Sequence, residues 1–151
     1  MAAGGDLTAD ERELVAAALA ARAHAYAPYS RFHVGAALRG DDGSVVTGAN
    51  VENAAYPATI CAERVAVGYA VAHGLRVFRQ LAVAGTGSAV CTPCGTCRQV
   101  LNEFAPDLEV LAVGGGGAVA RYLLGRDLLP DGFGPASLDS DQPPGATEDA
   151  G

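Results

Sequence analysis

Four cysteines in this chain are spaced in a way that could hold a metal ion. Cys91, Cys94 and Cys97 fall within the stretch CTPCGTC, and Cys61 stands alone upstream. Four thiolates around zinc make a closed structural site, whereas three leave a position for water and make a catalytic one. The N-terminal MAAGGDLTADERE lacks the pattern of a secretory signal, so we expect reduced thiols and a metal site rather than disulfides.

Three other interpretations of the cysteines are weaker. Free cysteines are commonly small buried hydrophobic residues, which suits Cys91 but not a Pro-Cys-x-x-Cys pair that opens a helix. A ferredoxin-like cluster needs a further cysteine and a proline, and Leu101 and Asn102 follow instead. A thioredoxin-like pair of Cys94 and Cys97 leaves Cys61 without a role.

The stretch TICAERVAV favours the catalytic form of the zinc site. Cys61 and Glu63 can face one point only if Cys61 lies half outside a helix and Glu63 lies in its first turn. Cys94 and Cys97 start a second helix in the same way, and the positive ends of two helix dipoles favour thiolates. Sequence alone leaves Cys91 open as a fourth ligand.

Glu63 and Arg64 have a use only at an open site. Three thiolates give the zinc site a net negative charge, which makes the metal a weaker Lewis acid. Arg64 could donate to the sulfurs and draw this charge back. Glu63 could take a proton from zinc-bound water and deliver it to a substrate nitrogen. On its own, Glu63 would be better explained as a favourable acidic residue in the first turn of a helix; together with Cys61 and the Pro-Cys-x-x-Cys pair, the catalytic interpretation is the stronger one.

The elements that position these residues follow an α/β pattern. Thr8 and Glu11 form a capping box that opens a helix to about Tyr26. The remaining predicted elements are strands at 32–38 and 45–49 joined by a hairpin, a helix from Cys61 to about His73, a strand at 80–84, a helix from Pro93 to Phe104, a strand at 108–113 and a short helical turn at 122–129. This order indicates an α/β sandwich with a partly parallel sheet.

Composition limits the domain count and the partners. A chain of 151 residues that is 50% hydrophobic predicts one domain, 1–134, and the polar residues 135–151, rich in Pro and Gly, predict a disordered tail. A net charge of −7 with no basic cluster argues against nucleic acid. No run approaches the ~20 apolar residues of a membrane span, so we expect no membrane partner.

The motifs together resemble a known family. Cys61-Ala62-Glu63 followed by PCGTCRQ at 93–99 is similar to the signature of the zinc-dependent cytidine deaminases. Cysteine at position 61, where relatives often have histidine, is similar to their small homotetrameric branch. Further family-like blocks are APYS at 27–30, FHVGAA at 32–37, GANVENAAY at 48–56 and LLP at 128–130. The resemblance spans about Tyr26 to Phe133.

This resemblance implies a three-layer α/β/α sandwich with a mixed sheet and one zinc ion per subunit. It implies a cytoplasmic homotetramer of pyrimidine salvage, a hydrolase of cyclic amidine C–N bonds that converts cytidine and 2′-deoxycytidine to uridine and 2′-deoxyuridine with release of ammonia. The implied roles are zinc binding by Cys61, Cys94 and Cys97, and proton transfer by Glu63. Substrate contacts would come from Phe32 on the base, Asn50 and Glu52 on the ribose hydroxyls, the Ala62 backbone on the pyrimidine, and Phe133 in a neighbouring subunit's site.

Two rival functions stay open at this point. One is deamination of another cytosine-bearing molecule, such as a nucleoside antibiotic of the blasticidin type. Asn50 and Glu52 argue against it, and a Glu52 carboxylate near the sugar would repel a phosphate, which favours a free nucleoside. The other is a structural module in which Cys91 completes a four-thiolate zinc site.

Overall fold

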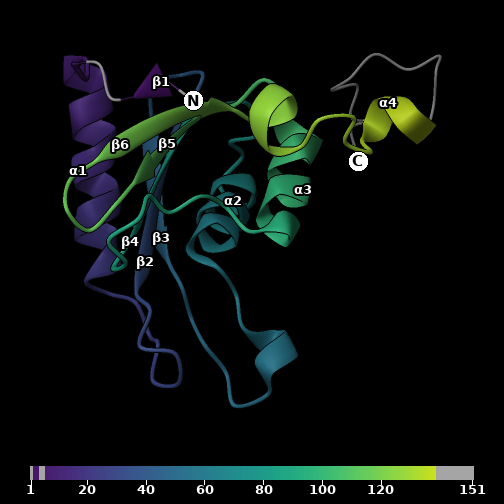
Figure 1. Cartoon of the computed structure of the whole chain (residues 1–151). Coiled ribbons are helices and arrows are strands. Elements are labelled where there is room, and N and C mark those ends of the chain that lie inside the picture. The colour runs from purple at the N-terminus through teal and green to yellow at the C-terminus, as the bar shows by residue number, and fades with distance from the viewer. Residues whose placement is uncertain (1, 4–5, 139–151) are drawn as a thin grey trace.

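The computed structural model describes residues 2–3 and 6–138, and these form three layers (Figure 1). A mixed sheet lies between helix α1 on one face and helices α2 and α3 on the other. The helices are α1 (Ala9–Arg22), α2 (Ala62–Ala72), α3 (Gly95–Phe104) and α4 (Pro135–Leu138), with short turns η1 (Tyr56–Ala58) and η2 (Leu124–Leu128). The strands are β1 (Ala2–Ala3), β2 (Val34–Gly40), β3 (Val45–Ala49), β4 (Phe78–Gly85), β5 (Glu109–Val113) and β6 (Val119–Leu123). The expected α/β/α sandwich is confirmed.

The order of strands places the two site helices side by side. Among the described residues the sheet runs β1-β6-β5-β4-β2-β3, and only the β4–β5 pair is parallel. Strands β2 and β3 form the predicted hairpin, in which Gly43 has φ +84°. Helix α2 follows β3, and α3 connects β4 to its parallel neighbour β5 on the same face of the sheet (Figure 1).

Helix α1 begins as predicted but ends earlier. Its capping box is formed, with the Thr8 hydroxyl accepting from the Glu11 amide and the Glu11 carboxylate accepting from the Thr8 amide. The helix ends at Arg22 rather than near Tyr26, so that boundary was wrong. The Tyr26 backbone pairs with the 50–52 segment instead. Its N–H donates to the Asn50 backbone carbonyl, and its carbonyl accepts from the Glu52 backbone N–H.

The sequence prediction missed strand β6. We expected a helical turn from Tyr122, but the chain stays extended to Leu123 and pairs antiparallel with β5, where Val119 faces Val113. The helical turn begins only at Leu124, as η2. A strand at this position depends on a distant partner, which local periodicity does not reveal.

Two apolar clusters hold the layers together. One packs α1 against the sheet through residues such as Leu14 and Leu111, and the other packs α2 and α3 against the opposite face through residues such as Leu81 and Leu101. Gly48 on β3 has a particular role, because a Cβ there would lie 2.4 Å from the Ala62 carbonyl oxygen in the first turn of α2. Glycine therefore lets the start of α2 lie directly on the sheet.

The C-terminal segment is described only in part. Residues 135–138 of the predicted tail form the short helix α4, and the rest of the tail lies outside the described residues. Within the described part of the chain, no helix is both long enough and apolar enough to cross a membrane.

Candidate metal centre and active site

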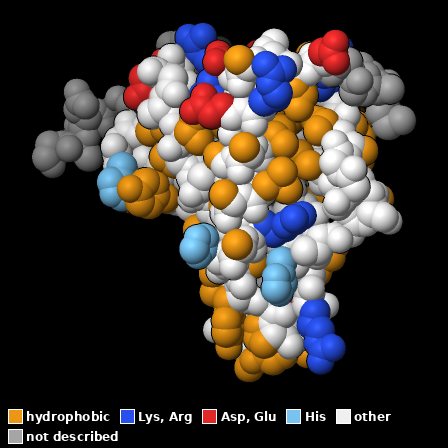
Figure 2. Space-filling model, turned by 90° about the vertical axis from the view of Figure 1, so that its left-hand side faces the viewer, with side chains coloured by type: hydrophobic (Ala, Val, Ile, Leu, Met, Phe, Trp, Pro, Cys, Tyr) orange, Lys and Arg blue, Asp and Glu red, His pale blue; other side chains and the backbone are white. Residues whose placement is uncertain are grey.

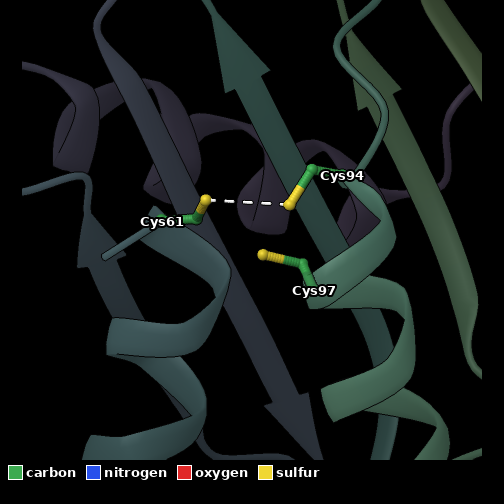
Figure 3. A group of neighbouring side chains, drawn as sticks. All are labelled: Cys61, Cys94 and Cys97. Atoms are coloured by element: carbon green, nitrogen blue, oxygen red, sulfur yellow. Dashed lines mark hydrogen bonds between the residues drawn. The ribbon is translucent and has the colours of Figure 1, made fainter. Parts of the chain in front are cut away.

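Three cysteine sulfurs from two helices converge on one point (Figure 3). The Sγ atoms of Cys61, Cys94 and Cys97 all lie within 4.8 Å of one another, and those of Cys61 and Cys94 are 3.8 Å apart. Two ligands of a tetrahedral zinc ion with bonds of about 2.3 Å stand about 3.8 Å apart. The three thiols therefore fit the spacing that zinc requires.

The predicted helix starts explain this convergence. Cys61 is the N-cap of α2 and Cys94 the N-cap of α3, both with extended backbone (φ −72°, ψ 154° and φ −67°, ψ 167°). Neither cysteine side chain caps its own helix, so both remain directed at the shared point. Cys97 lies in the first turn of α3 and is fully buried. Two positive helix ends thus face three sulfurs.

Arg64 lies against this sulfur cluster, as the sequence suggested. Its Nη2 donates to Cys61 Sγ at 3.7 Å and to the Thr59 carbonyl at 3.3 Å. Hydrogen bonds from Cys97 and then from Arg64 and Cys94 lower the pKa of Cys61 to about 5, and the bond to Cys61 raises the pKa of Cys97. A thiolate is the form that binds a metal, so this surrounding favours a cation.

Glu63 is a buried carboxyl beside the cluster. It is the second residue of α2 and is 4% exposed. Burial, and to a lesser extent the neighbouring Cys61, raises the pKa of Glu63 to about 7. A carboxyl with a pKa near neutrality can both accept and return a proton, which is the property required of a general acid–base.

Cys91 stands apart from the other three cysteines. It is not a member of the group whose sulfurs lie within 4.8 Å of one another in the described part of the chain. Burial raises the pKa of Cys91 to about 11, so it is held as a neutral thiol. The placement of Cys91 therefore disfavours the closed four-thiolate site.

A cavity of about 310 Å³ opens beside Glu63 and two of the three converging cysteines, Cys61 and Cys94. Of the predicted substrate contacts, it brings together Phe32, Asn50, Glu52 and Ala62, and the further lining residues are Ser30, Val34, Thr59, Cys61, Glu63, Cys91, Thr92 and Cys94. An adjoining hollow of about 420 Å³ is lined by Tyr29, Ser30, Glu52, Tyr56 and Thr59. A cleft thus leads from the surface to the thiol cluster.

Comparisons with known proteins agree with this geometry. Residues 8–112 match the model of the cytidine and deoxycytidylate deaminase zinc-binding region. A cytidine deaminase of Halalkalibacterium halodurans is 43% identical over 124 residues, which is 82% of this chain and 94% of that protein. One from Mycobacterium tuberculosis is 51% identical over 117 residues, 76% of this chain and 82% of that protein. The crystal structure of the cytidine deaminase from Burkholderia pseudomallei superimposes with a TM-score of 0.79 at 48% identity, covering 84% of this chain and all of that one.

The chain belongs to the zinc-dependent cytidine and deoxycytidylate deaminase family. The resemblance found in the motifs is therefore confirmed, and the zinc-binding character of the family agrees with the thiol cluster.

One predicted residue lies away from the cavity of this deaminase. Phe133 follows η2, is 59% exposed, and is absent from the cavity lining. The side-chain amides of Gln99 and Asn102 both donate to its carbonyl oxygen, at 2.8 and 3.2 Å, and fix its backbone on α3. Its expected contact with a neighbouring subunit stays a prediction.

Sequence reasoning assigned no role to two polar residues of this deaminase site. Arg98 donates to the Pro93 and Leu128 carbonyls at 2.7 and 2.9 Å, and so ties the loop before Cys94 to the end of η2. Ser30 lines the cavity and bonds to Glu52. Both belong to blocks that resemble the family, but the contacts of Arg98 with Leu128 and of Ser30 with Glu52 join segments far apart in the sequence and leave no periodic signal.

Proposed function

We propose that this protein deaminates cytidine and 2′-deoxycytidine, giving uridine or 2′-deoxyuridine and ammonia. The observation that carries the proposal is the buried Glu63 carboxyl beside three converging thiols at the inner end of a cavity. Membership of the deaminase family and the cytidine deaminases at 43–51% identity support it.

In the proposed reaction, Glu63 carries the protons. A zinc ion held by Cys61, Cys94 and Cys97 would supply a polarised water molecule as the nucleophile. The Glu63 carboxylate takes a proton from the attacking water and delivers it to N3 of the pyrimidine while oxygen bonds to C4. Glu63 then passes the second proton to the amine at C4, which leaves as ammonia. Water is consumed and no net proton is released, because one side chain serves as base and then as acid.

The other cavity residues would bind and orient the nucleoside. Phe32 lies at the cavity wall and can stack on the pyrimidine ring, while Ala62, buried at the first position of α2, offers backbone groups to the edge of the base. Asn50 and Glu52 line the cavity where polar groups can meet sugar hydroxyls. A carboxylate there would repel a phosphate at close range, so free nucleosides are favoured over nucleotides.

The decisive experiment measures ammonia release from cytidine by the purified protein. We expect turnover that a strong chelator abolishes and zinc restores. Glu63→Gln should keep its zinc and lose about 10²- to 10⁴-fold in kcat. Glu103→Gln makes the same chemical change on an exposed residue of α3 and should leave kcat unchanged. Normal turnover by the Glu63→Gln protein would refute the proposed proton carrier.

We further propose that the enzyme is a cytoplasmic homotetramer with shared sites. Large apolar side chains stand exposed in the lining of the cavity and the adjoining hollow, namely Tyr29, Phe32 and Tyr56. Tyr26 and Val51, whose backbones pair with each other, are exposed as well. Figure 2 shows apolar side chains gathered at the narrow end of the molecule, where the loops before β2 and before α2 lie in Figure 1. Such a patch is typical of a surface covered by another chain. The cytoplasm is a reducing compartment that keeps thiols reduced, as this site of free thiols requires.

Subunit mixing tests the shared site. Phe133→Ala and Glu63→Gln proteins should each be weakly active alone, and refolding them together should restore part of the activity if Phe133 acts on a neighbour's site. Sedimentation should give four chain masses. A fully active monomer would contradict the proposal. In the same assays, a cytosine-bearing antibiotic nucleoside preferred over cytidine would favour the rival substrate class.

A further inference from the structure

Ser30 holds a central position in the loop that forms one wall of the cavity. It lines both the inner cavity and the adjoining hollow. Its hydroxyl donates to Glu52 Oε1 and accepts from the Phe32 amide at 3.0 Å. The Ser30 hydroxyl therefore links Glu52, which is proposed to bind the sugar, to the backbone of Phe32, which is proposed to stack on the base.

The hydrogen bonds fix the direction of the Ser30 proton. A serine hydroxyl has a single hydrogen, and the Phe32 N–H occupies one of its acceptor positions. The proton is then donated to Glu52 Oε1. This bond is the largest of the causes that lower the pKa of Glu52, which keeps the carboxyl ionised. The Ser30 hydroxyl therefore holds Glu52 Oε1 in one position.

The two oxygens of Glu52 have different partners. Oε2 accepts from the amides of Tyr29 and Ser30, at 2.9 and 3.2 Å, and so has both lone pairs engaged. Among the described residues, Oε1 accepts from the Ser30 hydroxyl alone. The free lone pair on Oε1 is thus the place for a sugar hydroxyl to donate.

The loop needs these bonds to keep its shape. Arg31, between Ser30 and Phe32, has φ +59°, a left-handed conformation that is unfavourable for a residue with a side chain. The Phe32 carbonyl accepts from the side-chain Nδ2 of Asn50 at 2.9 Å. Both the N–H and the carbonyl of Phe32 are therefore held by hydrogen bonds. The backbone around Ser30 is therefore fixed, and its hydroxyl is held within hydrogen-bond distance of Glu52.

We propose that Ser30 is a positioning residue for substrate recognition, holding Glu52 Oε1 in the orientation that accepts a sugar hydroxyl. The inference rests on the proposed function, in which Glu52 meets the sugar. It predicts that the Ser30 side chain affects binding only of nucleosides that carry the sugar hydroxyl that donates to Glu52.

Three substitutions separate the hydroxyl from the shape of the side chain. Ser30→Thr keeps the hydroxyl, Ser30→Val has the shape of threonine without it, and Ser30→Ala removes it with the least change of volume. Each would be assayed with 2′-deoxycytidine and with its 3′-deoxy and 5′-deoxy analogues. Thermal unfolding of each variant would report whether the fold is kept.

We expect Ser30→Ala and Ser30→Val to raise KM for 2′-deoxycytidine about tenfold, the usual effect of one hydrogen bond to a charged group, with kcat changed less. Ser30→Thr should remain close to wild type. For one of the two analogues the Ser30→Ala penalty should disappear, because the hydroxyl that Glu52 accepts is missing. The penalty should also disappear in a Glu52→Ala background, since residues that act as a unit are not additive.

An equal loss for 2′-deoxycytidine and both analogues would overturn the inference, because Ser30 would then only shape the loop. Unchanged KM in an active Ser30→Ala protein would overturn it as well, while leaving the proposed function intact. A wild-type protein that releases no ammonia from either nucleoside would overturn the proposed function and this inference with it.

Discussion

The contact between Gly48 and the start of α2 yields a quantitative prediction. A Cβ at position 48 would lie 2.4 Å from the Ala62 oxygen and 2.6 Å from the Ala66 nitrogen. Ordinary contact begins at 3.4 Å, and both atoms belong to helix backbone, so no side chain can rotate aside. The start of α2 must therefore move by about 1 Å to accommodate Gly48→Ala.

This displacement should reduce both stability and activity. Overpacking of this kind costs about 1–3 kcal/mol in the free energy of unfolding, equivalent to a Tm lower by about 2–12 °C for a chain of this size. Since Ala62 and Glu63 form the first turn of α2, a shift of about 1 Å should also cost about 10²-fold in kcat/KM. Differential scanning calorimetry and the ammonia assay measure the two effects.

Gly68→Ala is the matched control on the same helix. A Cβ at Gly68 meets nothing within 4 Å, so alanine should stabilise α2 by about 0.5–1 kcal/mol and leave kcat/KM unchanged. Wild-type Tm and kcat/KM for Gly48→Ala would refute the reasoning. A lower Tm with wild-type kcat/KM would refute the part that links the position of α2 to the chemistry.

Three further predictions follow from contacts around the site and the sheet. Cys91→Ser should bind one zinc ion per chain with wild-type affinity, and loss of zinc on elemental analysis would restore the four-thiolate interpretation. Arg98→Ala frees the loop before Cys94 and should weaken zinc binding about 10- to 100-fold, as measured by competition with a chelator. Arg98→Lys should not restore the affinity, because lysine lacks the planar guanidinium that binds both carbonyls, and an unchanged zinc affinity in Arg98→Ala would contradict this. Hydrogen bonding from Arg121 at 2.6 Å lowers the pKa of Glu11 below 4.5. Because the folded pKa is depressed, this pair stabilises the fold above about pH 4.5, and its contribution is lost as pH falls through the folded pKa. The difference in urea midpoint between wild type and Glu11→Gln should therefore shrink on acidification, and a difference independent of pH would contradict it.

Local signals in the sequence located the chemistry well. Cys61 and Cys94 could be placed at helix N-termini because spacing around a helix start and the flanking proline are short-range properties. The capping box of Thr8 and Glu11 is local in the same sense. Such features depend on a few neighbouring residues, and the folded chain keeps them.

Errors arose where a distant segment outweighed local preference. Tyr26 leaves the helix because its backbone pairs with the segment that contains Asn50, and β6 exists because β5 offers Val113 opposite Val119. The bonds of Ser30 to Glu52 belong to the same class, since their partners are far apart in sequence. Periodicity within one segment carries no information about such partners.

The sequence by itself determined which groups could react: four thiols, of which three belong to two helix starts, and one carboxyl, with an arginine beside them. Only the tertiary structure decided that Cys91 stays outside the group and that Glu63 is buried with a pKa near 7. The physical reason is that residue type and helix spacing fix the chemistry a segment offers. Distances between segments and the loss of water around a charge arise only when the layers pack.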